Sequence, residues 1–314
     1  MNEIVSQFAI QGNVVEVAPL GNGLINTTYR VKTEEGQPDY VLQNVNNAIF
    51  PDVEMLMDNI VAVTSHIRAK LEAAGTEDID RKVLNFIPTK DGKYFYFDGA
   101  KYWRVMAFIP DTKSMTAVTP ETSYIVGETF GNFQAMLADF TEPLHEVIKG
   151  FHNIRWRFEQ WDKALAEDRA GRKAALATEI GWIESRREKM LAFWEMVERG
   201  ELPLRVTHND TKLSNILFDK DDEVLCVIDL DTVMSSTSLN DFGDAIRSYT
   251  NTGAEDDTEL ERVSMNIDTF RNYAAGYLSE RRATMSATER EWLPFSALSI
   301  TYEQVLRFLL VYIG

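Results

Sequence analysis

The chain has 314 residues, of which 45% are hydrophobic and 26% charged, the balance of a folded globular protein. This length suits two lobes of unequal size better than one small core. The formal net charge of −17 disfavours nucleic acid and anionic membrane surfaces as partners, because both carry negative charge. A small phosphate ligand is still compatible with this charge when a metal ion supplies positive charge.

The N-terminal residues 1–4 show no basic segment followed by an apolar core, which argues against a secretory signal. No uninterrupted apolar stretch approaches the length of a membrane span. The single cysteine, Cys226, excludes an intrachain disulfide, and its apolar surroundings predict a buried strand residue. We therefore expect a cytoplasmic protein, while the sequence leaves the oligomeric state open.

The first hundred residues favour short strands separated by turns. A helix is predicted to begin after Pro51-Asp52, with Met55, Ile60, Val63 and Ile67 on one side. Because β-branched and aromatic residues cluster between Gly and Asp turns, strands are predicted at 14–17, 27–31, 40–42, 83–87, 94–97 and 102–107.

Helical patterns dominate after residues 108–111. The segment 119–196 is predicted to be largely helical, with a stripe of apolar residues that is typical of a core. Strand character returns at 205–207, 216–218 and 225–228, and the chain is helical again from about 241. The stripe consists of Trp182, Ile183, Met190, Leu191 and Trp194.

These patterns predict an α+β protein with a β-rich N-terminal lobe, 1–107, and a mainly helical C-terminal lobe, 108–314, that contains an inserted hairpin. The hinge is expected near 107–112. The apolar segment 305–313 predicts a further C-terminal segment that covers it, because a strongly apolar helix seldom ends a protein without polar cover.

One segment carries a motif of the form His-x-Asp-x-x-x-x-Asn, and it spans His208, Asp210 and Asn215. Asp229 then closes the apolar strand that follows. Protein kinases have the same arrangement in their catalytic loop and magnesium-binding motif. The spacing therefore predicts a protein-kinase-like two-lobe fold, in which the N-terminal lobe binds a nucleotide and the C-terminal lobe carries catalysis and the substrate.

The residue types in this motif suit phosphoryl transfer, because that reaction depends on positioning the reactants and neutralising the charge of the phosphates. Magnesium prefers oxygen ligands, and we expect the amide of Asn215 and the carboxylate of Asp229 to hold Mg²⁺ with ATP in the cleft between the lobes. Asp210 would orient the acceptor hydroxyl and accept its proton.

Four neighbouring residues have alternative interpretations. Asp231 either takes part in metal or substrate binding or caps the next turn. Lys212 either contacts the γ-phosphate or lies on a solvated loop. His208 is either a general base or, as we expect for this motif, a packed scaffold residue. Asp241 is expected to accept backbone N–H bonds from the loop or to cap the following helix, and either role predicts a large loss of stability on its replacement.

The segment 21–29 resembles a phosphate-covering hairpin, because glycines let the backbone approach phosphates closely. A Gly-x-Gly turn between strands is otherwise an ordinary hairpin. In the nucleotide-binding interpretation the contacts come from Gly21, Gly23, Asn26 and Thr28, together with Gln43 and Lys212.

The loop and the two aspartates resemble the aminoglycoside phosphotransferase and choline kinase superfamily, and the longer strings are closest to N-acetylhexosamine 1-kinases. This resemblance covers most of the chain. It rests on 202–212, 227–234, 241–244, Phe151-His152-Asn153, Arg157-Phe158, 21–29 and 41–43.

The resemblance implies an ATP-dependent kinase that phosphorylates the anomeric hydroxyl of an N-acetylhexosamine and yields a sugar 1-phosphate. It also implies that Asp210 contacts the anomeric hydroxyl and that Arg307 contacts the sugar. The usual phosphate-binding lysine of the third strand is absent. Its place is taken by Gln43, which other members share, so Lys212, Lys32 or the metal must meet the phosphate charge.

Two other functions remain open. A kinase of another small alcohol, such as an amino alcohol, an aminoglycoside or a hydroxy amino acid, is compatible with the acidic composition. A nucleotide-binding pseudokinase would fit the absent lysine, but not the intact motif. Glu54 is either the acid of the partner helix, a role that is unclear without the lysine, or a surface residue. A neutral sugar would need hydrogen-bonding groups and an aromatic platform, for which Trp156, Trp161 and Trp292 are candidates.

Overall fold

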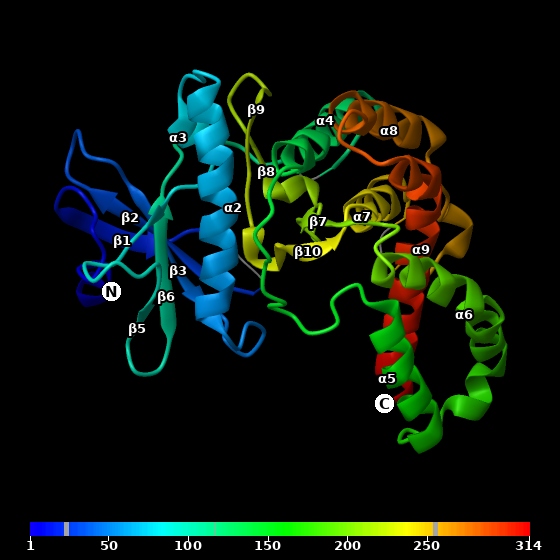
Figure 1. The fold of residues 1–314 in the computed structure, drawn as a ribbon. Coiled ribbons are helices and arrows are strands. Elements are labelled where there is room, and N and C mark those ends of the chain that lie inside the picture. Colours follow the sequence, from blue (N-terminus) through cyan, green and yellow to red (C-terminus); the bar gives the residue numbers. More distant parts are fainter. Residues whose placement is uncertain (22–24, 116, 254–256) are drawn as a thin grey trace. The chain divides into compact units, whose positions relative to one another are not determined.

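The computed structural model describes residues 1–21, 25–115, 117–253 and 257–314, which form two compact units (Figure 1). The first unit holds Met1–Thr116, Asp139–Ile148 and Ser214–Met234. The second holds Ala117–Ala138, Lys149–Leu213 and Ser235–Gly314. The division of function at residue 107 stays a prediction, and residues 139–148 and 214–234 pack within the first unit.

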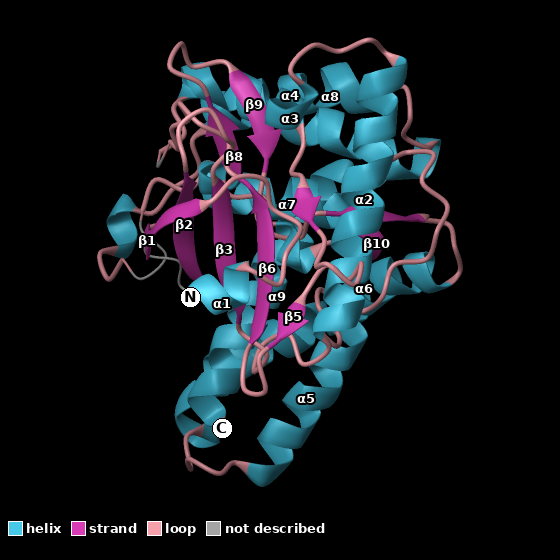
Figure 2. Cartoon of the chain, turned by 90° about the vertical axis from the view of Figure 1, so that its left-hand side faces the viewer, coloured by secondary structure: helices cyan, strands magenta, loops and turns pink. Residues whose placement is uncertain are grey.

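An antiparallel sheet forms the centre of the first unit, with strand order β1-β2-β3-β6-β4 and with β5 paired to β6 (Figure 2). Gln43 on β3 lies opposite Thr28 on β2 and opposite Arg104 on β6. The strands are β1 (Val14–Pro19), β2 (Thr27–Thr33), β3 (Tyr40–Val45), β4 (Phe86–Ile87), β5 (Tyr96–Phe97) and β6 (Tyr102–Ala107).

One face of this sheet packs an apolar core. Tyr40 and Leu42, two residues apart on β3, are buried in it, as the period of a strand requires. They are joined by Trp103 and Val105 of β6, and the short helix α1 (Asn2–Val5) closes this core at the N-terminus. The alternation of buried residues fixes the register, because a slip by one residue would turn the apolar side chains to the other face.

The helix α2 (Val53–Ala73) begins where the sequence predicts. The carboxylate of Asp52 accepts a hydrogen bond from the Met55 backbone N–H at 3.0 Å and so caps the first turn. Ile60 and Val63 are fully buried. Met55, in the first turn, is 40% exposed.

Two predicted strands are shorter than expected. The short helix α3 (Ile79–Lys82) precedes β4, so 83–85 lie outside the sheet and β4 pairs with β6 over two residues only. Residues 94 and 95 likewise precede β5. Both segments are rich in strand-forming residues, but the edge position of β4 and β5 limits their pairing.

A two-stranded hairpin, β8 (Ile216–Phe218) and β9 (Val224–Val227), completes the first unit. The carboxylate of Asp219 accepts hydrogen bonds from the backbone N–H groups of Asp221 and Glu223 and thereby fixes the turn. Ile216 pairs with Val227 across the hairpin. Cys226 is buried on β9, as predicted.

The second unit is mainly helical, so the predicted α+β fold is confirmed. β7 (Leu204–Thr207) pairs with β10 (Met234–Thr237), a strand that the sequence analysis missed because Met-Ser-Ser-Thr has no apolar alternation.

The helices are α4 (Pro120–Met136), α5 (Ile154–Glu167), α6 (Ala177–Glu198), α7 (Leu239–Tyr249), α8 (Ile267–Arg281) and α9 (Ala287–Ile313). The single-turn 3₁₀ helices of the chain are η1 (Lys173–Leu176), η2 (Leu213–Asn215), η3 (Leu230–Thr232) and η4 (Leu260–Arg262).

The helices α4 and α8 pack with their backbones in close contact. A Cβ atom on Gly127 would lie 2.1 Å from the carbonyl oxygen of Tyr273, and one on Gly276 would lie 2.0 Å from that of Tyr124. Larger residues at these positions would push the two helices apart.

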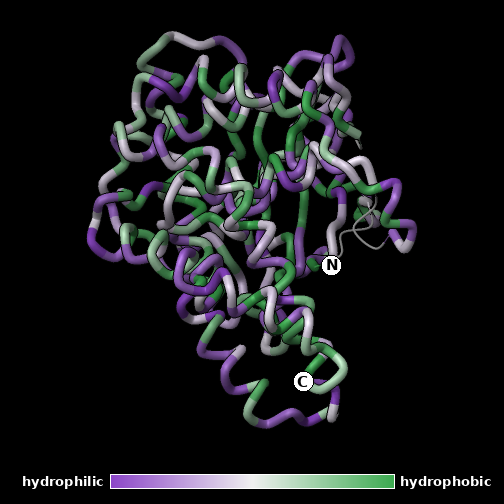
Figure 3. The backbone as a smooth tube through the Cα atoms, turned by 90° about the vertical axis from the view of Figure 1, so that its right-hand side faces the viewer, coloured by the Kyte–Doolittle hydropathy of each residue, from purple (hydrophilic) through white to green (hydrophobic). Residues whose placement is uncertain are grey.

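A cluster around α5, α6 and α9 holds the far end of the second unit. Trp161, Ile183, Met190 and Tyr302 are fully buried in it. Trp182, expected in the same stripe, is 37% exposed and lies under the Arg186 guanidinium. The last turns of α9 are green, hence hydrophobic, in Figure 3, and none of the described helices is long and apolar enough to cross a membrane.

Candidate active site

The loop that carries Asp210 begins where β7 ends, in the second unit. Asn209 adopts a left-handed conformation with φ 62°, which asparagine tolerates better than most residues. The backbone N–H groups of His208 and Asn209 donate to the two carboxylate oxygens of Asp241 at 2.9 and 2.7 Å. The side chain of Gln134 also donates to Asp241 at 2.7 Å. The buried carboxylate of Asp241 therefore fixes the backbone of the loop.

His208 is fully buried between aromatic rings. The edges of Phe130 and Phe133 contact it with ring centroids 5.7 and 5.8 Å away. Burial raises the pKa of Asp241, while the nearby His208 and the two backbone donors oppose that increase. His208 and Asp241 thus contact the loop from inside the protein.

Asp210 and Lys212 form an ion pair on the outer side of the loop. The Lys212 Nζ lies 2.8 Å from Asp210 Oδ1, and the Lys212 side chain is 61% exposed. Thr211, between them, is buried and bonded to Asp244 through both its N–H and its hydroxyl, at 3.3 and 3.2 Å. Tyr249 donates to the Thr211 carbonyl. Asp210 therefore stands on a backbone fixed on both sides.

The residues predicted to bind the metal lie at one end of the β8–β9 hairpin, in the first unit. The Ile228 N–H donates to the Asn215 carbonyl at 2.8 Å, so Asn215 lies opposite the residue that precedes Asp229. Asp229 is left-handed, with φ 59°, and starts the turn Leu230–Thr232. The hairpin thus brings an amide and a carboxylate to the same edge.

Asp231, two residues further on, belongs to a buried polar network. Its Oδ1 accepts from Arg104 Nη1 at 2.6 Å, and its Oδ2 accepts from Asn26 Nδ2 at 2.6 Å. The side chains of Arg104 and Asp231 are 3% and 5% exposed. Both carboxylate oxygens are therefore hydrogen-bonded within the protein. The structure thus gives Asp231 a role that the sequence did not suggest, an ion pair with Arg104.

The predicted nucleotide-binding polar residues lie in the same network. Gln43 donates to Thr28 Oγ1 at 3.0 Å and accepts from Arg104 Nε at 3.0 Å. Asn26 accepts from the Asn46 backbone N–H at 3.0 Å. Their side chains support one another across β2, β3 and β6, and a contact with nucleotide stays a proposal for each.

Sequence reasoning missed Arg104. The available signal was a single charged residue inside the otherwise apolar and aromatic strand β6, where an arginine is rarely buried unless it is paired. The partner could not be identified, since Asp231 lies 127 residues away in sequence.

The glycine hairpin is described in part. Gly21 has φ 69°, and the Leu20 N–H donates to the Thr28 carbonyl at 2.9 Å. Gly23 lies outside the described residues. Gly21 is therefore in a conformation that favours glycine, and its approach to phosphates stays a prediction.

Two further candidates lie on exposed surfaces of the first unit. Lys32 is 3.6 Å from Glu16 on the neighbouring strand, and both side chains are at least half exposed. Glu54 is exposed in the first turn of α2. The structure therefore gives neither residue a buried partner of the kind that Arg104 has.

Arg307 lies on α9 beside a buried charged group in the second unit. His152 Nδ1 is 2.8 Å from Glu303 Oε2, and Arg157 is 3.7 Å from the other oxygen of Glu303. Burial and the positive charge of Arg307 oppose the charge on His152, but the attraction of Glu303, with that of Asp244, outweighs them and raises the pKa of His152. Arg307 is thus close enough to influence this group, and Asp244 connects it to the Asp210 loop.

The tryptophans proposed as a platform have different environments. Trp161 is fully buried and donates to Glu184 at 2.8 Å, so it belongs to the core. Trp292 packs against Phe193 and Phe295. The guanidinium of Arg157 lies 5.1 Å from the Trp156 ring, which places Trp156 beside the charged group at Arg307.

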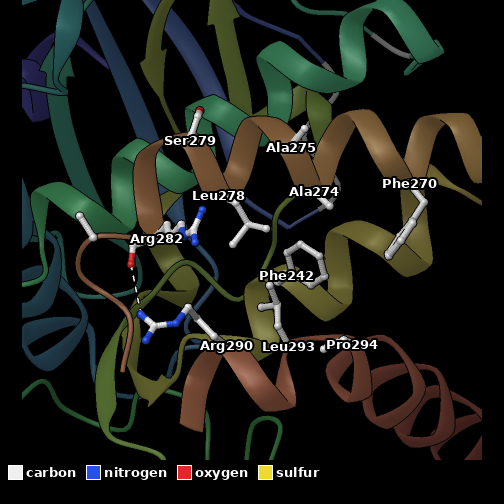
Figure 4. A pocket seen from close by; sticks show the side chains of 11 residues that line it. Phe242, Phe270, Ala274, Ala275, Leu278, Ser279, Arg282, Arg290, Leu293 and Pro294 are labelled. Atoms are coloured by element: carbon white, nitrogen blue, oxygen red, sulfur yellow. Dashed lines mark hydrogen bonds between the residues drawn. The ribbon is translucent and has the colours of Figure 1, made fainter. Parts of the chain in front are cut away.

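A pocket of about 1210 Å³ opens between α7, α8 and α9 (Figure 4). Phe242 and Leu278 give it apolar walls, and Arg290 at its edge donates to the Arg282 carbonyl at 3.5 Å. Its lining includes none of the residues that the sequence analysis proposed for the site.

The metal donors expected from the sequence are few. Among the residues that the structure describes, no group of three His, Cys, Asp or Glu side chains is arranged to hold a metal ion. Magnesium in phosphoryl-transfer sites takes one or two carboxylates and completes its shell with phosphates and waters. Asn215 with Asp229 fits that pattern, since neither a thiolate nor a histidine is required.

Comparison with known proteins identifies the family. The model of the phosphotransferase enzyme family matches residues 16–282. An aminoglycoside phosphotransferase from Alicyclobacillus acidocaldarius is similar in structure, with a TM-score of 0.57 and 13% identity over 99% of this chain and 96% of that one. A spectinomycin phosphotransferase solved with ADP and spectinomycin gives a TM-score of 0.53 and 12% identity over 97% and 95% of the two chains.

At these identities the structural similarities establish the fold, and the kinase-like fold expected from the sequence is confirmed. The family match covers both the sheet of the first unit and the loop with Asp210. The chain therefore belongs to the phosphotransferase enzyme family.

Proposed function

We propose that the chain transfers the γ-phosphoryl group of ATP to a hydroxyl of a small molecule, and that the acceptor is the anomeric hydroxyl of an N-acetylhexosamine. The product would be a sugar 1-phosphate. The observation that carries this proposal is the Asp210 loop, whose backbone is fixed by Asp241 and Asp244 while the Asp210 side chain remains partly exposed.

Rigid support for Asp210 matters because a general base must stay within hydrogen-bond reach of the proton it takes. Asp210 accepts the proton of the acceptor hydroxyl as the new P–O bond forms, and the bond from the γ-phosphorus to the bridging oxygen of ADP breaks. Lys212, which pairs with Asp210, is placed to exchange that contact for one to phosphate.

Nucleotide binding is assigned to the first unit. Asn215 and Asp229 would hold magnesium with an amide and a carboxylate oxygen, and the glycine hairpin would cover the phosphates. Bound magnesium would neutralise charge on the β- and γ-phosphates. ATP as the donor is supported by the ADP and AMP found in spectinomycin phosphotransferase structures.

The charged group at Arg307 supports a sugar as the acceptor. It combines Arg157, Arg307 and a His152 with raised pKa around one carboxylate, Glu303. A cationic acceptor would be repelled by this excess of positive charge, whereas the hydroxyl and amide groups of a neutral sugar can accept hydrogen bonds from guanidinium groups. The anomeric hydroxyl is more acidic than an ordinary alcohol, so a carboxylate suffices as its base.

The alternative acceptor is another small alcohol, such as an aminoglycoside, an amino alcohol or a hydroxy amino acid. The net charge of −17 favours this class in general, because it attracts cations over long distances. We prefer the sugar because the local charge near Arg307 has the opposite sign.

A panel assay separates the two. The protein is supplied with ATP, magnesium and free sugars, amino alcohols or aminoglycosides in turn, and the product is mapped by phosphorus NMR. Phosphate on C1 of N-acetylglucosamine or N-acetylgalactosamine supports the sugar kinase. Turnover with basic acceptors alone rejects it in favour of the alternative.

A further inference from the structure

We propose that Arg104 is a positioning residue that fixes Asp229 for its metal–nucleotide role, and that Asp231 is the anchor of Arg104 instead of a metal ligand. This inference rests on the proposed function, which assigns Asp229 to magnesium. It adds a residue that neither the family match nor the sequence motif identifies.

The state of Asp231 is the first argument. Arg104 and Asn26 engage its two oxygens, each at 2.6 Å, and all three side chains are at least nine-tenths buried. Both oxygens thus already take part in hydrogen bonds, one of them to a charged guanidinium, in a site shielded from water where such bonds are strong. The carboxylate is thus suited to hold the turn.

Arg104 is itself held in one orientation. Its Nε donates to Gln43, which in turn donates to Thr28, so a chain of hydrogen bonds crosses three neighbouring strands. The guanidinium lies 5.6 Å from the Phe86 ring centroid, and Nη1 is 3.9 Å from the sulfur of Met57. Because these contacts restrain the guanidinium of Arg104, it can determine where the carboxylate of Asp231 lies.

The turn between Asp229 and Asp231 transmits this restraint. Asp229 occupies a left-handed conformation that costs energy for a non-glycine residue, and the chain forms a 3₁₀ turn at once. Asn59 of α2 donates to the Val233 carbonyl at 2.9 Å and fixes the far end of the turn. Asp231 fixes its middle, so loss of Arg104 would free the segment that presents the Asp229 carboxylate.

The position of Arg104 also explains how the sheet compensates for a missing lysine. Protein kinases place a lysine on the third strand, and β3 here carries the neutral Gln43 instead. Arg104 lies directly opposite Gln43 in register. The positively charged side chain is therefore on β6 instead of β3, and it pairs with Asp231 in the turn that follows Asp229. Because Arg104 is buried, it is better suited to position this turn than to contact phosphate directly.

The test compares Arg104→Met and Arg104→Lys with a matched control, Arg30→Met. Arg30 lies in the same sheet and pairs with Asp39 at 2.7 Å, but it has no contact with the 229–231 turn among the interactions that the described residues show. Affinity for ATP is measured by calorimetry with and without magnesium, and KM is measured for each substrate.

For Arg104→Met we expect magnesium-dependent ATP affinity to fall by about 10- to 100-fold, the usual effect of removing a residue that orients a metal ligand. Affinity for ATP without magnesium and KM for the acceptor should change far less. Arg104→Lys should recover part of the loss, and Arg30→Met should behave as wild type. A folded Arg104→Met protein with unchanged magnesium-dependent affinity would overturn the inference.

Removing Arg104 alone leaves a buried, unpaired carboxylate and endangers folding. The double variant Arg104→Met with Asp231→Asn removes both charges, and it should show the same loss of magnesium-dependent affinity while retaining a cooperative melting transition. Wild-type affinity in this folded double variant would equally contradict the inference. If wild-type protein itself binds no magnesium–ATP, the proposed function fails instead.

Discussion

The fixed position of Asp210 depends on two buried carboxylates beneath its loop, Asp241 and Asp244. Asp241 receives three N–H donors, two of them from the backbone next to Asp210, and Asp244 receives a fourth from Thr211. The motif His-x-Asp-x-x-x-x-Asn allowed the loop to be located from sequence. The sequence also predicted that Asp241 accepts backbone N–H bonds from this loop, and the structure shows that His208 and Asn209 are the donors, a pairing over about 32 residues.

At the same scale, replacing Asp241 should destabilise the protein strongly. Asp241→Asn puts amide hydrogens against N–H donors in a buried site, and we expect the free energy of unfolding to fall by about 2–4 kcal/mol. Urea denaturation followed by circular dichroism measures this. The exposed Asp268→Asn serves as the control and should unfold like wild type. A loss equal to that of the control would contradict the anchoring role.

Cys226 gives a second prediction for a single residue. Burial on β9 raises the pKa of its thiol to about 12, so the thiolate that reacts with disulfide reagents is scarce at neutral pH. We expect no labelling by a thiol reagent within hours in buffer and complete labelling in urea. Rapid labelling of the native protein would show that β9 opens easily.

Among the elements, those with strong patterns were predictable and those defined by tertiary pairing were not. The strand β6 and the capped start of α2 agree with the sequence-based expectation. β10 has no apolar alternation and exists because β7 offers it hydrogen bonds. Trp182 matched a helical stripe, yet α6 leaves it partly exposed. Local sequence does not specify which neighbour covers a given face.

The contact between α9 and the segment that precedes α5 should depend on pH through the His152–Glu303 pair. Burial opposes the charge on each residue, but their mutual attraction outweighs it, so the pKa of His152 is raised from 6.5 and that of Glu303 is lowered from 4.5. Stabilisation by His152 is complete below its ordinary pKa and is lost as pH rises through the raised value. Stabilisation by Glu303 is present above its ordinary pKa and is lost as pH falls through the lowered value.

We therefore expect Tm to be highest between these limits and to decline at alkaline pH. His152→Gln should flatten the alkaline decline, because the group that loses its proton is gone. Asp244 of α7, Arg157 of α5 and Arg307 of α9 also act on the pair and remain in this variant. Differential scanning fluorimetry from pH 5 to pH 9 tests this, with the more exposed His66→Gln as control. An unchanged alkaline slope in His152→Gln would refute the assignment.

For the whole molecule, the sequence sufficed to predict the α+β fold and the family, because the motif and the strand-rich first hundred residues are both local signals. It did not reveal the network of Arg104, Asp231 and Asn26, whose members are brought together only by folding. The acceptor is the least predictable part, because the charged group proposed to contact it joins residues far apart in sequence, such as His152 and Glu303.

The central claim is that Asp210 acts on the acceptor while Asn215 and Asp229 hold the metal–nucleotide. The most direct test measures phosphoryl transfer and magnesium–ATP affinity in Asp210→Asn, with the exposed Asp221→Asn as control. We predict that kcat falls by about 10²–10⁴-fold in Asp210→Asn, while nucleotide affinity stays near that of wild type and the control is fully active. Full activity of Asp210→Asn with every acceptor would contradict the account.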